Sequence, residues 1–249
     1  MNEDVVRARY MDVYLMGKTS TKIIENALDE GRLNLLEPEA KTICIDYGIP
    51  TPDFSVATSK DEALKASEKM GYPVVLKIVS PDILHKTEAG GVIVGLNSSE
   101  EVGKGYQQII QSSKRYKADA KVDGVLVQKM APKGTEVIVG GLKDPQFGQT
   151  LMFGLGGVFV EILKDVTFRI APIDESDARS MMSEIKAYPL LKGYRGQEPV
   201  DQDAIVKILL EASKLLMDLP EINQMDLNPI MAYNKGASVV DARMLLEKR

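Results

Sequence analysis

Two short apolar runs, at residues 73–79 and 91–96, flank a polar loop that contains the chain's only histidine, His85. Each run has the length of a strand, and the glycine pair at the end of the loop is a turn signal. Gly90 and Gly91 allow backbone amides to approach an anion closely, although a plain turn has the same pattern. We therefore predict a strand, a phosphate-handling loop and a second strand.

Lys77 lies in the middle of the first apolar run. An unpaired buried ammonium is costly, so the position calls for a partner. One interpretation is an edge strand whose lysine points at water. The other, which we favour, is a strand that faces a cleft in which phosphate oxygens supply the partner.

His85 has charged neighbours, Asp82, Lys86 and Glu88, so a packed core role is not expected. A lone histidine is most often structural or solvent-exposed, and this alternative stays open. The chain has one cysteine and one histidine, which excludes an internal disulfide and a zinc site made of several such residues. An unperturbed imidazole, with a pKa of about 6.5, is mostly neutral at pH 7 and is able to accept a phosphoryl group.

The segment 221–243 predicts a hairpin whose turn is centred near Asn234 and Lys235. Asp226 and Asn228 are two residues apart on a strand, so they share one face. Asn228 then falls opposite Asp241 on the partner strand. Oxygen ligands of this kind suit Mg²⁺, which keeps several waters and bridges nucleotide phosphates. The alternative is an ordinary solvated strand face.

Composition excludes several classes of protein. The net charge of -5 and the absence of long Lys/Arg blocks argue against nucleic-acid binding. There is no apolar run of the roughly 20 residues that a membrane span needs, and the N-terminus lacks the apolar core of a signal peptide. We expect no membrane association and, from the cysteine content, a cytoplasmic location.

The remaining pattern is α+β. Residues 1–34 are expected to form a peripheral helical segment, and 35–130 and 131–249 to form two lobes joined near the sequence APKG. The C-terminal lobe is richer in strand signals, including one at 158–163, and two helical patterns interrupt them.

Several runs together resemble the ATP-grasp β subunit of ADP-forming acetate–CoA ligases: GYPVVLKIVSPDILHKTEAGGV, LLEPEAKTICIDYGIPTP, GLGGVFVEILKDVTFRIAPI and MDLNPI. The resemblance covers residues 23–245. The chain is also similar, more distantly, to the succinyl-CoA synthetase β subunit, but it has HKTE in place of that subunit's basic glycine loop. The resemblance implies an ATP-grasp fold, in which two α/β lobes hold the nucleotide in the cleft between them.

The resemblance also implies roles for nucleotide-binding residues. Lys77 would contact phosphates beside the Gly90–Gly91 pair. Gln128, Lys129 and Met130 would lie at the adenine hinge, and Glu136 would approach the ribose.

For the reacting groups, the resemblance implies that Asn228 and Asp241 hold Mg²⁺. His85 would be the second phosphohistidine, which receives phosphate from a histidine on a partner subunit and passes it to ADP. Asp226 would orient or stabilise its ring. The cofactors implied are Mg²⁺ and ATP or ADP.

The reaction implied is acyl-CoA + ADP + Pi ⇌ acid + ATP + CoA, with acetyl-CoA as the expected acyl-CoA. A partner α subunit would bind CoA and form the acyl phosphate, in an α₂β₂ heterotetramer. Two alternatives are an ATP-grasp ligase that makes an acyl phosphate directly and a non-catalytic nucleotide-binding regulatory subunit.

Overall fold

The computed structural model describes residues 18–157, 164–194, 196 and 198–247. The expected strand at 158–163 and the first 17 residues of the expected helical segment lie outside these residues. Within the described part, no helix is both long and apolar enough to cross a membrane.

The chain divides by its internal contacts into two compact units. The first, here called the histidine unit, contains residues 36–38 and 52–132. The second, here called the hairpin unit, contains residues up to 35, 39–51 and 133–249. The expected lobe 35–130 therefore differs from the histidine unit, because residues 39–51 pack in the core of the hairpin unit.

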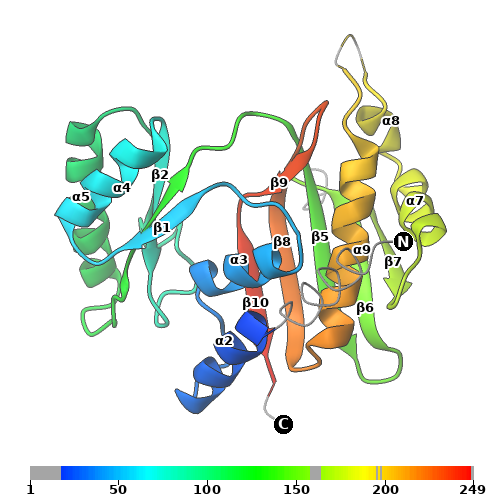
Figure 1. The fold of residues 1–249 in the computed structure, drawn as a ribbon, viewed down its shortest axis with the longest axis horizontal. Helices are drawn as coiled ribbons and strands as arrows, with labels where there is room; N and C mark the ends of the chain where they lie inside the picture. The colour runs from blue at the N-terminus through cyan, green and yellow to red at the C-terminus, as the bar shows by residue number, and fades with distance from the viewer. Residues whose placement is uncertain (1–17, 158–163, 195, 197, 248–249) are drawn as a thin grey trace, which may run out of the picture. The chain divides into compact units, whose positions relative to one another are not determined.

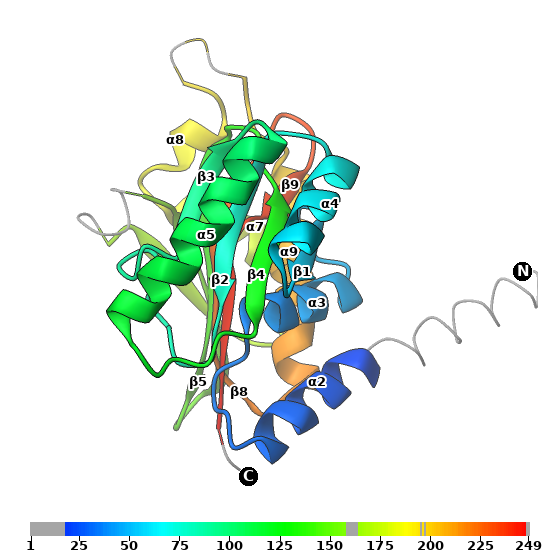
Figure 2. The ribbon, with the colours of Figure 1, turned by 90° about the vertical axis from the view of Figure 1, so that its left-hand side faces the viewer.

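The histidine unit is an antiparallel four-stranded sheet with the strand order β1-β4-β2-β3. Two helices, α4 and α5, pack on one face of this sheet and against each other (Figures 1 and 2). Its elements are β1 (Phe54–Ala57), α4 (Lys60–Met70), β2 (Val74–Val79), β3 (Val92–Leu96), α5 (Ser99–Tyr116) and β4 (Gly124–Lys129).

Both helices of the histidine unit begin at a serine cap. The Ser59 and Ser98 hydroxyls accept hydrogen bonds from the amides of Glu62 and Glu101, at 3.3 and 3.2 Å. The Glu62 carboxylate reaches back one residue beyond its cap, where the Thr58 amide donates to it at 2.7 Å. These local bonds satisfy amides that a helix start otherwise leaves unpaired, so the sequence alone determines where both helices begin.

The hairpin unit contains a larger antiparallel sheet with the order β10-β8-β5-β6-β7, and β9 pairs with β8. Helix α9 packs on β5, β6 and β8, and α7 packs beside α9 (Figure 1). Helix α3 (Glu37–Asp46) belongs to this unit from Glu39 onward, and its first two residues belong to the histidine unit. The other elements are α2 (Lys18–Asp29), β5 (Thr135–Asp144), β6 (Gly148–Leu155), β7 (Val166–Ile170), α7 (Glu175–Glu184), α8 (Tyr188–Leu191), α9 (Gln202–Asp218), β8 (Ile222–Ala232), β9 (Ala237–Val239) and β10 (Ala242–Leu246).

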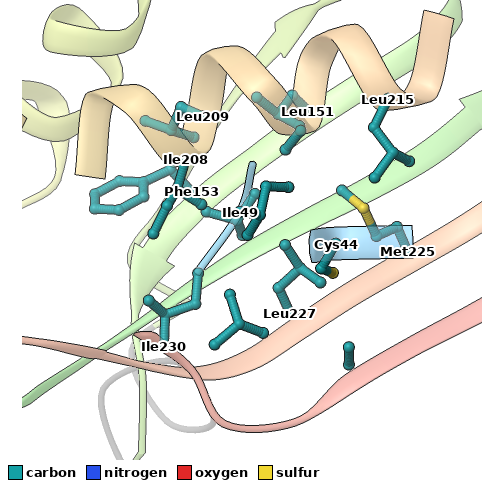
Figure 3. Packing of buried hydrophobic residues seen from close by; sticks show 14 of the residues in the cluster. Cys44, Ile49, Leu151, Phe153, Ile208, Leu209, Leu215, Met225, Leu227 and Ile230 are labelled. Atoms are coloured by element: carbon teal, nitrogen blue, oxygen red, sulfur yellow. The ribbon is translucent and has the colours of Figure 1, made fainter. Parts of the chain in front are cut away.

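The core of the hairpin unit draws on segments far apart in the sequence. Leu209 and Leu215 of α9, Phe153 of β6 and Cys44 of α3 are all buried in one cluster (Figure 3). Ile24 of α2 belongs to it as well. Helix α2 thus packs one apolar face on the core while most of its other side chains are exposed.

Candidate functional site

Lys77 is an interior residue of the histidine unit. Its strand, β2, has β4 on one side and β3 on the other, and its side chain is 6% exposed. The ammonium donates to Glu37 Oε1 at 2.5 Å. The edge-strand interpretation is therefore wrong, and the structure supplies a protein partner that the sequence reading did not identify.

Glu37 contacts a second lysine through its other oxygen. Glu37 Oε2 pairs with the ammonium of Lys86, whose side chain is 19% exposed. We call Glu37, Lys77 and Lys86 the charge cluster. Because buried charges need partners, one carboxylate between two ammoniums compensates both in part.

His85 directly precedes Lys86 but is oriented differently. Its side chain is 61% exposed, and Nδ1 lies 3.9 Å from Glu88 Oε1. This contact is an ion pair only when the imidazole is protonated. The expectation that His85 has no packed core role is confirmed, and the ring is accessible to a reacting phosphoryl group.

Gly90 and Gly91 close a tight turn at the end of the loop. Their amides donate to loop carbonyls: Gly90 N–H to Thr87 at 3.0 Å and Gly91 N–H to Lys86 at 2.7 Å. Gly90 has a φ of +63°, and a Cβ on Gly91 would lie 2.5 Å from Ile78 Cγ2. In this arrangement both amides close the loop's own turn, as in the plain-turn alternative, and their approach to an anion stays a prediction.

The end of β4 carries the residues expected at the adenine. Gln128 is fully buried, and the Lys129 ammonium donates to the Gly71 and Tyr72 carbonyls at 2.8 and 3.1 Å. The Met130 amide donates to a backbone carbonyl at 3.1 Å. The Lys129 side chain is thus used to bind backbone, which fixes this strand end.

In the hairpin unit, the predicted hairpin register is confirmed. Ala232 pairs with Ala237 around the Asn234–Lys235 turn, and the Asn228 amide donates to the Asp241 carbonyl at 3.1 Å. Asp226 and Asn228 are exposed, whereas the residues on either side of Asp226 are buried. Strand alternation therefore places the two polar side chains on one face, as expected.

Arg243 is a site residue that the sequence reading missed. It pairs directly with Asp226 across the β8–β10 ladder. Both line a hollow of about 480 Å³ on the sheet, together with Asn228 and apolar side chains that include Met152 and Phe168. The signal was available, because Arg243 lies two residues after Asp241 on a strand.

The electrostatics of this face favour a cation. Asp226 keeps contact with solvent, but the walls of the hollow remove part of its water, and this partial desolvation raises its pKa. The nearby charge of Asp241 raises the pKa further, and the guanidinium of Arg243 opposes the change. Bringing a cation to this face would relieve the repulsion between the two carboxylates.

The residues present fit a magnesium–nucleotide site better than a protein-only metal site. Among the described residues, no group of three or more His, Cys, Asp or Glu side chains is arranged to hold a metal. Mg²⁺ usually takes only one or two protein oxygens and completes its shell with waters and phosphates. Asn228 and Asp241 match that requirement.

Glu136 lies near the start of β5, and its side chain is exposed. Its backbone carbonyl accepts a hydrogen bond from the Gly156 amide at 2.7 Å. The expected site residues thus form two groups. The histidine unit holds those for phosphate and adenine, and the hairpin unit holds Glu136 and the metal and carboxylate residues.

Comparisons with known proteins identify the family of the chain. The family model for the ATP-grasp domain matches residues 26–246. The β subunit of ADP-forming acetate–CoA ligase I from Pyrococcus furiosus is 53% identical over 225 residues, which are 90% of this chain and 97% of that subunit.

Solved structures give the same result. Acetyl-coenzyme A synthetase 1 of Candidatus Korarchaeum cryptofilum, solved with coenzyme A, Ca-AMPCP and HgCl⁺, superposes with a TM-score of 0.90 at 52% identity. The match covers 92% of this chain and all of that one. A second structure of that protein contains Mg-AMPPCP, with its phosphohistidine segment pointing towards the nucleotide-binding site (TM-score 0.82, 50% identity, 92% of this chain and 100% of that one). The chain therefore belongs to the ATP-grasp family, in the branch that contains the β subunits of ADP-forming acetate–CoA ligases.

Proposed function

We propose that this chain is the nucleotide-binding β subunit of an ADP-forming acyl-CoA synthetase that uses acetyl-CoA. With its partner it converts acyl-CoA, ADP and phosphate to acid, ATP and CoA. The observation that carries the proposal is the exposed His85 beside a buried, lysine-rich charge cluster. The related synthetase with a phosphohistidine segment supports the same assignment.

The chemistry at His85 takes place in two transfers. A neutral imidazole nitrogen of His85 attacks the phosphorus of a phosphohistidine on the partner subunit. A P–N bond to His85 forms as the P–N bond to the partner's histidine breaks, and that histidine leaves as the free imidazole. In the second transfer a β-phosphate oxygen of ADP attacks the phosphorus, the P–N bond breaks, and the imidazole returns to its neutral form. Such transfers depend mainly on positioning and on charge neutralisation.

The surrounding residues supply that positioning. Lys77 contacts the phosphates, and the Gly90–Gly91 turn shapes the loop that carries His85. Asp226 orients the imidazole when the ring receives or gives up the phosphoryl group. When bound, Mg²⁺ neutralises phosphate charge, and Asn228 and Asp241 are its protein ligands.

The nucleoside is held by residues from the ends of two strands. Gln128, Lys129 and Met130 form the adenine hinge, and Glu136 binds the ribose. Because the Lys129 ammonium is occupied by carbonyls, the backbone of this segment is its contact with the base.

The partner is an α subunit that binds CoA and forms the acyl phosphate, in an α₂β₂ heterotetramer. The β-subunit relative from Pyrococcus furiosus, which the chain matches over nearly its whole length, supports this division of labour. A reducing cytoplasm remains the expected location, because the chain has a single cysteine.

The test is labelling of the full-length chain with γ-³²P-ATP and Mg²⁺, with and without the α subunit. We expect acid-labile, base-stable label on the wild type and none on His85→Ala. Glu88→Ala is the matched control, because Glu88 is an exposed neighbour in the same loop and the variant should keep the label.

Two outcomes would contradict the proposal. Full turnover by His85→Ala would indicate a ligase that forms the acyl phosphate directly. Tight ADP binding without label, even when the α subunit is present, would indicate a regulatory subunit.

A further inference from the structure

Glu37 is a buried carboxylate that the transfer chemistry does not use. Its side chain is 4% exposed, and it lies 40 residues from Lys77 and 49 from Lys86 in the sequence. Its two oxygens each accept one hydrogen bond, Oε1 from the Lys77 ammonium and Oε2 from the Lys86 ammonium. A single residue thus connects the lysine proposed to bind phosphate with the loop that carries His85.

Lys86 anchors the base of that loop at two points. Its side chain pairs with Glu37, and its carbonyl accepts the Gly91 amide at 2.7 Å. The preceding residue, His85, is left mostly exposed. The contact with Glu37 therefore holds the loop at its base without covering the imidazole.

The two lysines share one negative charge. In a poorly solvated site the attraction between a carboxylate and an ammonium is strong. Each lysine therefore reduces the stabilisation that the other lysine receives from the Glu37 carboxylate. A phosphate that draws Lys77 away strengthens the pairing of the Glu37 carboxylate with Lys86. Conversely, loss of Lys86 strengthens the pairing of Glu37 with Lys77, which then moves to phosphate less readily.

We propose that Glu37 is a positioning residue that links phosphate binding at Lys77 to the seating of the His85 loop through Lys86. The inference rests on the proposed function, because it requires Lys77 to contact nucleotide phosphate. Linkage makes the effect reciprocal: nucleotide binding tightens the base of the loop, and an anchored loop favours nucleotide binding.

The chain's single histidine provides a direct measurement of loop seating. Full-length protein with isotope-labelled histidine and an affinity tag that lacks histidine gives one imidazole signal set by NMR. We expect this signal to move when ADP and Mg²⁺ are added to the wild type. In Lys86→Gln it should already differ without nucleotide, and its response to ADP should shrink.

Lys117→Gln is the matched control. Lys117 pairs with Asp82 at 2.8 Å, so the variant removes the same charge and an ion pair at the same loop without touching Glu37. We expect its imidazole signal to respond to ADP as in the wild type. An equal loss of response in both variants would overturn the inference, because the effect would then be one of general charge.

ADP affinity, measured by calorimetry in a double-mutant cycle, tests whether Lys86 affects nucleotide binding through Glu37. We expect Lys86→Gln to weaken ADP binding about fivefold, at the lower end of typical linkage between sites. In the Glu37→Gln background, Lys86→Gln should have no further effect. The same weakening in both backgrounds would show that Lys86 acts on phosphate directly and would overturn the inference.

The outcomes separate the inference from the proposed function. If the wild type binds no ADP, both the proposed function and the linkage through Glu37 are wrong. If ADP binds and the imidazole response of Lys86→Gln is normal, only the linkage through Glu37 is wrong. If Glu37→Gln does not fold, the NMR comparison of Lys86→Gln with Lys117→Gln still decides, because both side chains reach solvent.

Discussion

The two units hold their charged site residues in opposite settings. In the histidine unit, Lys77 and Glu37 are nearly fully buried and bound to each other. In the hairpin unit, Asp226 and Arg243 stand side by side on the exposed face of a sheet. The buried ion pair is part of the packing of its unit, whereas the charges on the open strand face do not support the fold.

The difference follows from how each setting solvates charge. Water stabilises groups on an open sheet face, so they need no fixed partner. Inside the histidine unit the Glu37 carboxylate contributes to stabilising the Lys77 ammonium, and removing it takes away an ion pair that a buried charge needs. The two units should therefore respond differently to substitution, and four substitutions test this difference.

The largest effect is expected for Glu37→Ala. Removing the carboxylate leaves the Lys77 and Lys86 ammoniums without it, and breaking a buried ion pair typically costs about 3 kcal/mol or more. Urea denaturation should measure this loss of the free energy of unfolding. Glu100→Ala is the control, because it breaks the exposed pair with Lys104 and should leave the denaturation midpoint unchanged. Equal effects would remove the contrast between buried and exposed charge.

Gly91→Ala should come next, with a loss of about 1–3 kcal/mol from overpacking. The added methyl would lie 2.5 Å from Ile78 Cγ2 and 3.0 Å from the Lys86 carbonyl. The comparison is Gly48→Ala, where φ is +72° and nothing lies within 4 Å, so only backbone strain is added. If Gly91→Ala lowers the free energy of unfolding less than Gly48→Ala does, the base of the loop relaxes to accommodate the added methyl group.

Asp201→Ala tests a carboxylate in the hairpin unit that does support the fold. Asp201 caps α9 by accepting from the Ala204 amide at 3.0 Å, and its other oxygen accepts from the Gly236 amide at 2.8 Å. Losing such a cap costs about 1 kcal/mol. Denaturation at neutral pH should detect it.

The same variant should show a defined pH dependence. Hydrogen bonds from the Gly236 and Ala204 amides hold the pKa of Asp201 below its ordinary value. A lowered native pKa means that the stabilisation is fully present above the unfolded pKa of about 3.9 and is lost as the pH falls through the native value. The difference in the free energy of unfolding between wild type and variant should therefore become smaller as the pH falls. If this difference in the free energy of unfolding is the same at every pH, the variant has lost packing and not the effect of the carboxylate charge.

The smallest change in stability is expected for Asp226→Asn. The side chain is exposed, so the free energy of unfolding should change by no more than about 0.5 kcal/mol. Transfer of label from His85 to ADP should nevertheless slow, as followed by loss of ³²P from the protein. A large stability loss with normal transfer would reverse the assignment of Asp226 from site to scaffold.

Local features of the fold could be predicted from the sequence. The hairpin register followed from a two-residue turn and strand alternation, because both depend on neighbours along the chain. Ser59 and Ser98 likewise marked helix starts, since a cap acts on amides only a few residues away. The ATP-grasp family could also be recognised, from runs that are specific in combination.

Other features were decided only by the tertiary structure. The partner of Lys77 is Glu37, 40 residues earlier, and no local pattern connects them. The sheet order β1-β4-β2-β3 places β2 in the interior, which decided that Lys77 is buried and not an edge residue. The sequence determined which residues carry charge and which way strands alternate. Only the packing of distant segments decided which charges lose water, because solvation depends on everything that surrounds a side chain.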